Sequence, residues 1–163
     1  MKNDTQPDSP FYSASVHTNG LLRVMESVRA TEGNAPIGDL YAVYGQHIHH
    51  DSDRAVSAAT ALAEAGLDPS HAAAYDEPAW DRVIRASMDE GLALTGNDVG
   101  TPILGLHSDS GRRVAFFGPV ISRRLPLDRA LQLWDGLTLM SGVDGFWELK
   151  RTRTEAPDFS PSP

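Results

Sequence analysis

Cysteine is absent from all 163 residues of the chain. Without cysteine the chain can form no disulfide, no thiolate metal site and no iron–sulfur cluster, and it has no cysteine nucleophile. Any thiol chemistry in which this chain takes part must therefore use a thiol from another molecule.

Basic charge and long apolar runs are also scarce. The net charge is -8, with a sequence pI of about 5.1, so the electrostatic signature of a nucleic-acid-binding protein is missing. No stretch approaches the roughly 18 consecutive apolar residues of a membrane-spanning helix, and the start, MKNDTQPDSPFYSASV, lacks the pattern of a signal peptide. We expect a cytoplasmic protein whose partners include neither nucleic acid nor membrane.

The sequence motifs of three common enzyme classes are missing as well. The chain contains no G-x-S-x-G, no G-x-x-x-x-G-K-[ST] and no G-x-G-x-x-G. These patterns accompany serine hydrolases, phosphate-binding loops and dinucleotide-binding folds respectively. None of the three classes is expected here.

The part of the chain that can form a core lies between two polar ends. Residues 1–17 and 156–163 are rich in Ser, Pro and Asp, and we expect them to form a flexible arm and a flexible tail. The length of the remainder suits a single domain at 18–155. Within it we expect a helical subdomain at 18–97, followed by a smaller part at 98–155.

Helical spacing dominates the first subdomain. Apolar residues recur every three to four positions, as at Leu21, Met25 and Val28. The expected helices begin at Thr18 or Asn19, at Pro36, at Asp53 and at Asp76. The helix that begins at Asp76 is expected to be the longest and to end near Gly96.

After Gly100 the pattern changes to that of strands. Residues 102–107 (PILGLH) and 113–117 (RVAFF) are two apolar runs separated by SDSGR, which predicts a hairpin. Proline cannot donate to a strand ladder, so Pro102 belongs at the first residue of a strand or at an edge. Pro126 then starts a last helix, on which Leu127, Leu131, Trp134 and Leu137 are expected to face inward. Because two strands alone make a marginal sheet, helices, a second copy or another protein must cover or extend it.

Four runs of this second part resemble a known family. They are GNDVGTPILGL, VAFFGPVISR, LWDG and FWELKRTRTEAPDF. Together they are similar to the C-terminal half of actinobacterial DsbA-like proteins, specifically those described as mycothiol-dependent nitroreductases. The resemblance also covers the helical stretch from Leu21 to Gly96. It implies a helix-rich α/β protein with a truncated DsbA-like thioredoxin fold: a helical domain, a cis-proline hairpin and a C-terminal helix.

The resemblance also assigns roles to residues of the hairpin. Pro102 would be the cis proline, and the backbone of Thr101 would pair with a thiol substrate or cofactor. Phe117, Gly118 and Pro119 would belong to the second strand and the loop beyond it, on the ligand side. The family's strand–helix–strand unit, which carries C-x-x-C, has no counterpart in this sequence. We therefore expect no thiol–disulfide exchange from this polypeptide alone.

A cluster of histidines follows the second expected helix in GQHIHHDSD. His47, His50 and Asp51 are weak candidates for metal ligands, since imidazole and carboxylate suit zinc. The simpler interpretation is a solvated helix end, where histidines interact favourably with the helix dipole. His49 differs because the resemblance also places a histidine there. It could act as a general acid or base, or serve packing alone.

Basic residues concentrate near the C-terminus in ELKRTRTE. Arg151 and Arg153 could hold a carboxylate or sugar hydroxyls of a ligand. The alternative is a solvated segment in which these side chains pair with Glu148 and Glu155.

Two functional hypotheses follow. The first is a small-molecule enzyme of isomerase or thiol-assisted type, acting on a conjugated or aromatic substrate with mycothiol or another small thiol. The second is a non-catalytic subunit, or half of a split DsbA-like oxidoreductase, that completes its sheet with a partner chain or as a homodimer. In its simplest form, the second hypothesis makes the chain a truncated remnant of the fold.

Overall fold

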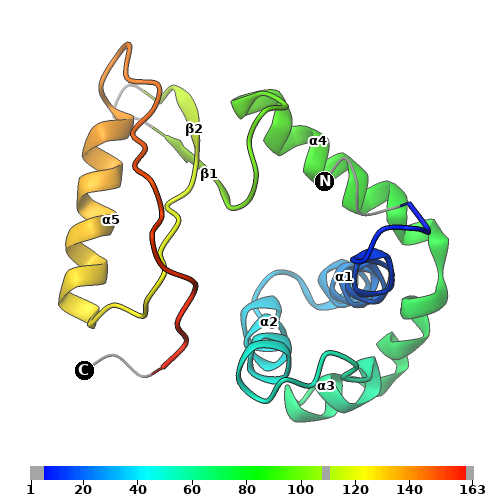
Figure 1. Cartoon of the computed structure of the whole chain (residues 1–163). Helices are drawn as coiled ribbons and strands as arrows, with labels where there is room; N and C mark the ends of the chain where they lie inside the picture. The colour runs from blue at the N-terminus through cyan, green and yellow to red at the C-terminus, as the bar shows by residue number, and fades with distance from the viewer. Residues whose placement is uncertain (1–5, 108–110, 161–163) are drawn as a thin grey trace. The chain divides into compact units, whose positions relative to one another are not determined.

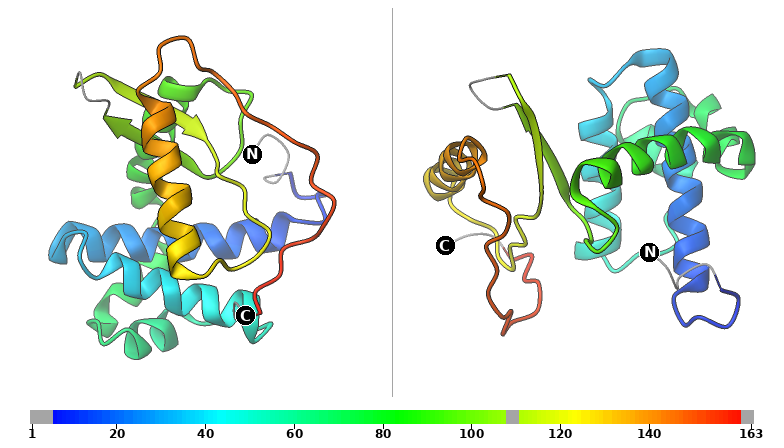
Figure 2. Two further views of the ribbon diagram at one scale, coloured as in Figure 1. Left: turned by 90° about the vertical axis from the view of Figure 1, so that its left-hand side faces the viewer. Right: turned by 90° about the horizontal axis from the view of Figure 1, so that it is seen from above.

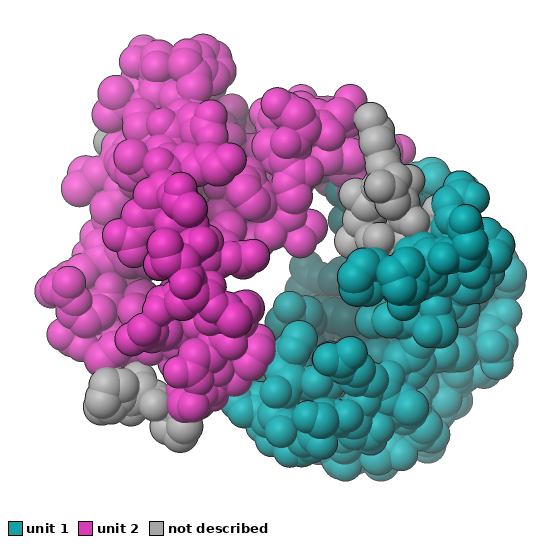
Figure 3. Space-filling view, in the orientation of Figure 1, with its two compact units in different colours: residues 1–87 teal, residues 88–163 magenta. Residues whose placement is uncertain are grey.

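Two compact units make up the chain in a computed structural model that describes residues 6–107 and 111–160 (Figure 3). The first unit comprises residues 1–87 and the second residues 88–163. The division falls inside a helix, earlier than the boundary at residue 97 that the sequence suggested. Each unit is described by itself below.

The first unit is built from helices alone in its described part (Figure 1). They are α1 (Tyr12–Glu32), α2 (Ile37–Gly45), the π-helical turn η1 (Gln46–His50), α3 (Ala58–Glu64), the 3-10 helices η2 (Pro69–Asp76) and η3 (Pro78–Trp80), and the start of α4 (Asp81–Thr95). No helix within the described ranges has both the length and the apolar character to cross a membrane.

The longest helix is α1, and it begins earlier than expected. Residues 12–17, which we assigned to a flexible arm, form its first turns. Thr18 does not cap the helix, because its hydroxyl donates to the carbonyl oxygens of Ala14 and Ser15. Asn19 instead donates to Asp81 Oδ1 at 3.0 Å. Side chains that look like caps in the sequence are thus used within the helix or in tertiary contacts.

The cap of α3 also differs from the prediction. Ser57 is the N-cap, since its hydroxyl oxygen accepts a hydrogen bond from Thr60 N at 3.0 Å. Asp53, the expected cap, accepts from Ala55 N in the preceding turn. Both residue types are good caps, and the one nearer the helical run is used.

The hydrophobic core lies entirely in the first unit among the described residues. Its members come from α1, α2, α3, η2 and the segment before α3. They are Leu21, Val24, Met25, Val28, Leu40, Tyr44, Val56, Ala58, Ala61, Leu62 and Ala74. Fully burying a Val or Leu side chain stabilises a fold by about 1.5–3 kcal/mol, so this cluster is the main source of stability.

Polar contacts hold α1 to the elements that cross it. Arg23 Nε and Nη2 donate to the two oxygens of Asp81 at 2.7 and 2.9 Å, and Arg23 Nη1 donates to the carbonyl oxygen of Tyr75 at 3.0 Å. This bidentate geometry fixes both the position and the direction of the start of α4.

In its described residues, the second unit contains a hairpin and one complete helix. Strands β1 (Ile103–His107) and β2 (Arg113–Phe117) are antiparallel, with Ile103 opposite Phe117. Helix α5 (Leu127–Ser141) lies beside the hairpin (Figure 2). On the side of Ile103 the end of α4 approaches closely, since a Cβ added at Gly91 would lie 3.4 Å from Ile103 Cδ1. The described part of the chain is thus helix-rich with one small antiparallel sheet, an α/β arrangement.

One expectation for the second unit is wrong. On α5, Leu127, Leu131 and Trp134 were predicted to face inward, but they are 75, 53 and 47 % exposed. Two strands offer too little surface to cover a helix of this length. In the described part of the tail, Asp158 N donates to Ser122 O at 2.6 Å, and the flexibility expected for this tail stays a prediction.

The segment FWELKRTR, at residues 146–153, forms neither of the two structures that its sequence left open. It contains no helix and no strand. Beyond it, Asp158 forms a parallel bridge with Arg123. This bridge pairs the backbone of the C-terminal segment with an earlier part of the unit.

Candidate functional site

The outer edge of β1 is open in the described structure. Gly118 N donates to the carbonyl oxygen of Pro102 at 2.8 Å. Pro102 and Gly118 are therefore a hydrogen-bonded pair, and the next pair along the ladder is Ile103 with Phe117. Hydrogen-bonded and non-hydrogen-bonded pairs alternate along an antiparallel ladder. The peptide groups of Ile103 and Gly105 therefore face away from β2, and no other described strand pairs with them.

Thr101 and Pro102 stand at the head of this edge. The peptide bond between them is cis, and so is the bond between Gly118 and Pro119. Both Thr101 and Pro102 are exposed. Among the residues that the structure describes, none forms a hydrogen bond with Thr101. Its N–H and C=O groups are available to a ligand.

Phe117 flanks the same end of the hairpin. Its ring lies close to Gly100, since a Cβ added there would be 3.4 Å from Phe117 Cε2, and the side chain is 46 % exposed. Phe116 points to the other face and packs against Phe146, with ring centroids 5.7 Å apart. The two phenylalanines thus face opposite sides, as adjacent residues of a strand must.

Gly118 and Pro119 follow β2 in different settings, and the ligand-side role that the resemblance implies for both stays a prediction. Gly118 is buried, its φ is 104°, and its N–H is used by Pro102. Its N–H thus closes the open end of the hairpin. Pro119 lines an apolar groove of about 270 Å³ next to α5, together with Leu104 and Trp134.

Arg151 and Arg153 are exposed and form no ion pair with any described residue. Glu155, one of their expected partners, instead accepts a hydrogen bond from Arg123. The structure therefore does not bring the two arginines together with an acidic partner, and their role in ligand binding stays a prediction.

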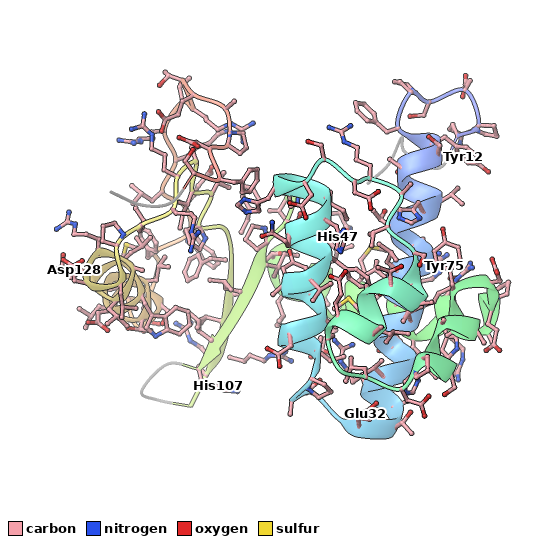
Figure 4. The ribbon with its side chains drawn as sticks, turned by 90° about the horizontal axis from the view of Figure 1, so that it is seen from below. Tyr12, Glu32, His47, Tyr75, His107 and Asp128 are labelled. Atoms are coloured by element: carbon pink, nitrogen blue, oxygen red, sulfur yellow. The ribbon has the colours of Figure 1, made fainter. Side chains whose placement is uncertain are left out.

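His47, which is labelled in Figure 4, lies between two carboxylates. Its Nε2 lies 2.9 Å from Glu64 Oε2 and its Nδ1 lies 3.5 Å from Asp53 Oδ2, and the side chain is only 15 % exposed. The hydrogen bond to Glu64 raises the pKa of His47 above its ordinary value, and the charges of Glu64 and Asp53 act in the same direction. The imidazole ties η1 to α3.

The other members of the histidine cluster are exposed. His49 and His50 belong to η1, and Asp51 accepts a hydrogen bond from Gln46 Nε2 at 2.9 Å. Within the described ranges, no group of three or more metal-ligating side chains is arranged to hold an ion. His49 lies in the first unit and the hairpin in the second, so its acid–base role stays a prediction.

Two polar clusters have no signal in the sequence. Ser27 Oγ is 2.8 Å from His71 Nδ1, and Glu32 Oε1 is 3.2 Å from His71 Nε2. His17 Nδ1 is 2.8 Å from the hydroxyl of Tyr75. Each cluster joins α1 to η2 across dozens of residues, so no local motif could have predicted either one.

Comparison with protein-family models gives a finding that agrees with these features. Residues 3–151 match the Rv2466c-like family, whose description is "Mycothiol-dependent nitroreductase Rv2466c". The match covers both units almost completely and includes the whole hairpin.

Proposed function

Because the chain belongs to the Rv2466c-like family of mycothiol-dependent nitroreductases, we propose that its hairpin binds mycothiol or another small thiol at Thr101 and Pro102. The observation that carries the proposal is the open backbone of Thr101 at the head of an unpaired strand edge. Strand edges bind extended peptide-like groups through main-chain hydrogen bonds.

The residues of this edge fit a cysteine-based thiol. Amide groups of such a ligand can pair with the backbone of Thr101, and the exposed ring of Phe117 offers an apolar surface beside it. When bound, the small thiol supplies the nucleophilic sulfur that the chain lacks. Arg151 and Arg153 are the candidates for the polar part of the ligand.

The reaction that we propose is addition to, or isomerisation of, a conjugated or aromatic substrate. Support comes from the number of thiols that each chemistry needs. Disulfide exchange proceeds through a mixed disulfide and uses a second thiol to resolve it, whereas addition chemistry needs a single nucleophilic sulfur. A cysteine-free chain that binds one thiol cofactor meets the second requirement. His49 is the proposed general acid or base.

Binding is tested by calorimetry with mycothiol on three proteins. Thr101→Val removes the hydroxyl and keeps the backbone N–H, whereas Thr101→Pro removes the N–H. We expect Thr101→Val to bind as the parent chain does, and Thr101→Pro to bind about tenfold more weakly because a main-chain hydrogen bond is lost. No heat of binding from the parent chain, or equal loss in both variants, would contradict the proposal.

A second candidate function is that of a subunit whose sheet is completed by another chain. Two observations favour it. The second unit contains no buried large hydrophobic residue among those described, and Leu131 and Trp134 of α5 are about half exposed. An isolated two-stranded sheet is marginal in water, so an added strand and its helix would supply the missing cover.

Sedimentation velocity at micromolar concentration distinguishes a self-completed sheet from one completed by a different chain. A dimer whose formation is prevented by Leu131→Glu supports completion by a second copy, with Leu22→Glu, an exposed position on α1, as the control. A chain that stays monomeric and binds no added partner through the leucines of α5 would rule out this candidate.

A further inference from the structure

The second unit has an apolar groove to which the proposed function assigns no ligand. It has a volume of about 270 Å³ and is lined by residues of β1, of the loop after β2 and of α5. Its lining residues are all apolar, and the indole N–H of Trp134 is the one side-chain group among them that can form a hydrogen bond. An ionised ligand would lose water there without gaining a partner, so the lining favours a neutral, apolar molecule.

The groove has an inner floor and an exposed rim. Leu104, Leu133 and Leu137 are half-buried and form the floor, whereas Ile121 and Trp134 of the rim are 46 and 47 % exposed. A ligand that rests on the floor would also cover the rim and remove its apolar surface from water. Because the rim includes an indole ring, it favours a ligand with a planar conjugated system.

The charged residues around the groove provide no positive excess that would hold an anion. Residues 119–137, which supply most of the lining, include three arginines and two aspartates. Glu155 accepts a hydrogen bond from one of these arginines, Arg123, and Asp158 acts on the same guanidinium. The four carboxylates thus outnumber the arginines, so the local field does not attract an anion. A cation would be held back by the lining, to which no carboxylate contributes.

The groove lies on the same face of the hairpin as Pro102. Side chains alternate along a strand, so Pro102 and Leu104, two residues apart, lie on one face and are separated by about 7 Å. Gly118 pairs with Pro102, and the next residue, Pro119, lines the groove. A thiol bound at Thr101 and Pro102 would therefore lie at one end of the groove.

We propose that this groove binds the conjugated substrate, and that this substrate is a neutral, largely apolar carbonyl compound. The inference rests on the proposed thiol site and names its second reactant. The sulfur of the bound thiol bonds to one carbon of the substrate's C=C bond, and the conjugated carbonyl takes up the displaced electron pair. The other carbon then accepts the proton that the thiol released, so that S–H is added across the double bond. Reversal after rotation about the resulting single bond returns the thiol and leaves an isomerised substrate.

Amide chemical shifts of the isotope-labelled full chain test the proposal with methyl cinnamate, cinnamate and cinnamylamine, in the absence of thiol. The three probes share one planar skeleton and are neutral, anionic and cationic respectively. We expect saturable shifts with methyl cinnamate at Leu104, Val120 and Leu133. The two ions should bind at least about tenfold more weakly, because they lose hydration without gaining a partner. Equal or tighter binding of either ion, or shifts elsewhere in the chain, would overturn the assignment.

Two variants of α5 locate the ligand. Ala130→Phe places a ring in the groove and should weaken the binding of methyl cinnamate at least about tenfold, because the ring takes the place of the ligand. Leu131→Phe, at an exposed neighbouring position outside the lining, should leave binding unchanged. Thermal unfolding of both variants shows whether the fold persists. Ile121→Ser at the exposed rim should also weaken binding, without placing any larger side chain in the groove. Unchanged binding in Ala130→Phe and Ile121→Ser would overturn the proposal.

The result for the groove is separable from that for the thiol site. Methyl cinnamate should bind the Thr101→Pro variant as it binds the parent chain, because Thr101 does not line the groove. Binding of mycothiol without binding of methyl cinnamate overturns this inference and leaves the proposed function standing. The reverse result supports the groove and removes the thiol site. If a second copy of the chain occupied the groove instead, the same amides would shift with protein concentration alone, and that result would also overturn the inference.

Discussion

Glycine 20 illustrates how a single missing side chain permits a tertiary contact. Replacing Gly20 with Ala places a methyl group within 2.4 Å of the Tyr75 ring, which must then move and lose its hydrogen bond to His17. Overpacking of this kind costs about 1–3 kcal/mol. We expect a lower midpoint of urea unfolding for Gly20→Ala.

The matched control for this prediction is Gly38→Ala in α2. Nothing lies within 4 Å of an added Cβ at Gly38. Alanine is a better helix former than glycine by up to about 1 kcal/mol, so this variant should raise the midpoint slightly. Shifts of the same sign in both variants would show that packing at Gly20 does not matter.

His47 makes stability depend on pH near neutrality. Its hydrogen bond to Glu64 raises the pKa of the folded state above the ordinary value of about 6.5. The stabilisation is therefore fully present below that ordinary value, and it is lost as the pH rises through the raised pKa of the folded protein. We expect the difference in unfolding free energy between the parent chain and His47→Gln to shrink as the pH is raised from mildly acidic to alkaline.

The cause of that shift is tested by Glu64→Gln. This change removes the carboxylate and keeps the size of the side chain. NMR titration should show a lower His47 pKa in the variant than in the parent chain. An unchanged titration would mean that Glu64 is not the partner that matters.

Between elements, Arg23 links α1 to the start of α4 through a two-pronged contact with Asp81. Arg23→Lys keeps the charge but loses the two-pronged contact with Asp81 and the hydrogen bond to Tyr75 O. Because Asp81 is partly exposed, we expect a loss of only about 1 kcal/mol in unfolding free energy. Arg82→Lys, at an exposed neighbouring position, should change it little. Equal effects would contradict the assignment.

The order of elements was largely predictable, whereas their ends were not. Apolar spacing indicates α1, α2, α4, α5 and the hairpin, because each must present one face to other parts of the fold. The predicted ends of the helices were wrong where several polar residues could serve as caps. The cap of α3 is Ser57, and Asp53 accepts a hydrogen bond in the preceding turn. The side chains of Thr18 and Asn19 form hydrogen bonds that do not cap α1.

For the candidate site, too, one part could be predicted from the sequence and another could not. The segment around Thr101 and Pro102 is recognisable because its residues are contiguous and resemble those of a family. The contacts of His47 with Glu64 and of His17 with Tyr75 depend on how helices pack. Periodicity does not specify the rotation of one helix against another, so these pairs required the structure.

At the scale of the whole molecule, apolar burial is distributed unevenly. Every buried hydrophobic residue that the structure describes belongs to the first unit, and the second unit exposes much of α5. Hydrogen exchange of the full chain should therefore show the slowest amides in α1 and α3 and faster exchange in the hairpin and α5. Addition of a partner that completes the sheet should slow exchange in the hairpin. Equally slow exchange in both units without a partner would contradict this account.

The central claim is that the hairpin of the second unit is a site for a small thiol. The measurement that tests it most directly is titration of the isotope-labelled full chain with mycothiol, followed by amide chemical shifts. We predict saturable shifts at residues 100–104 and at Phe117 and Gly118, which the Thr101→Pro variant loses. Shifts confined to the first unit, or no saturable shift at all, would contradict the claim.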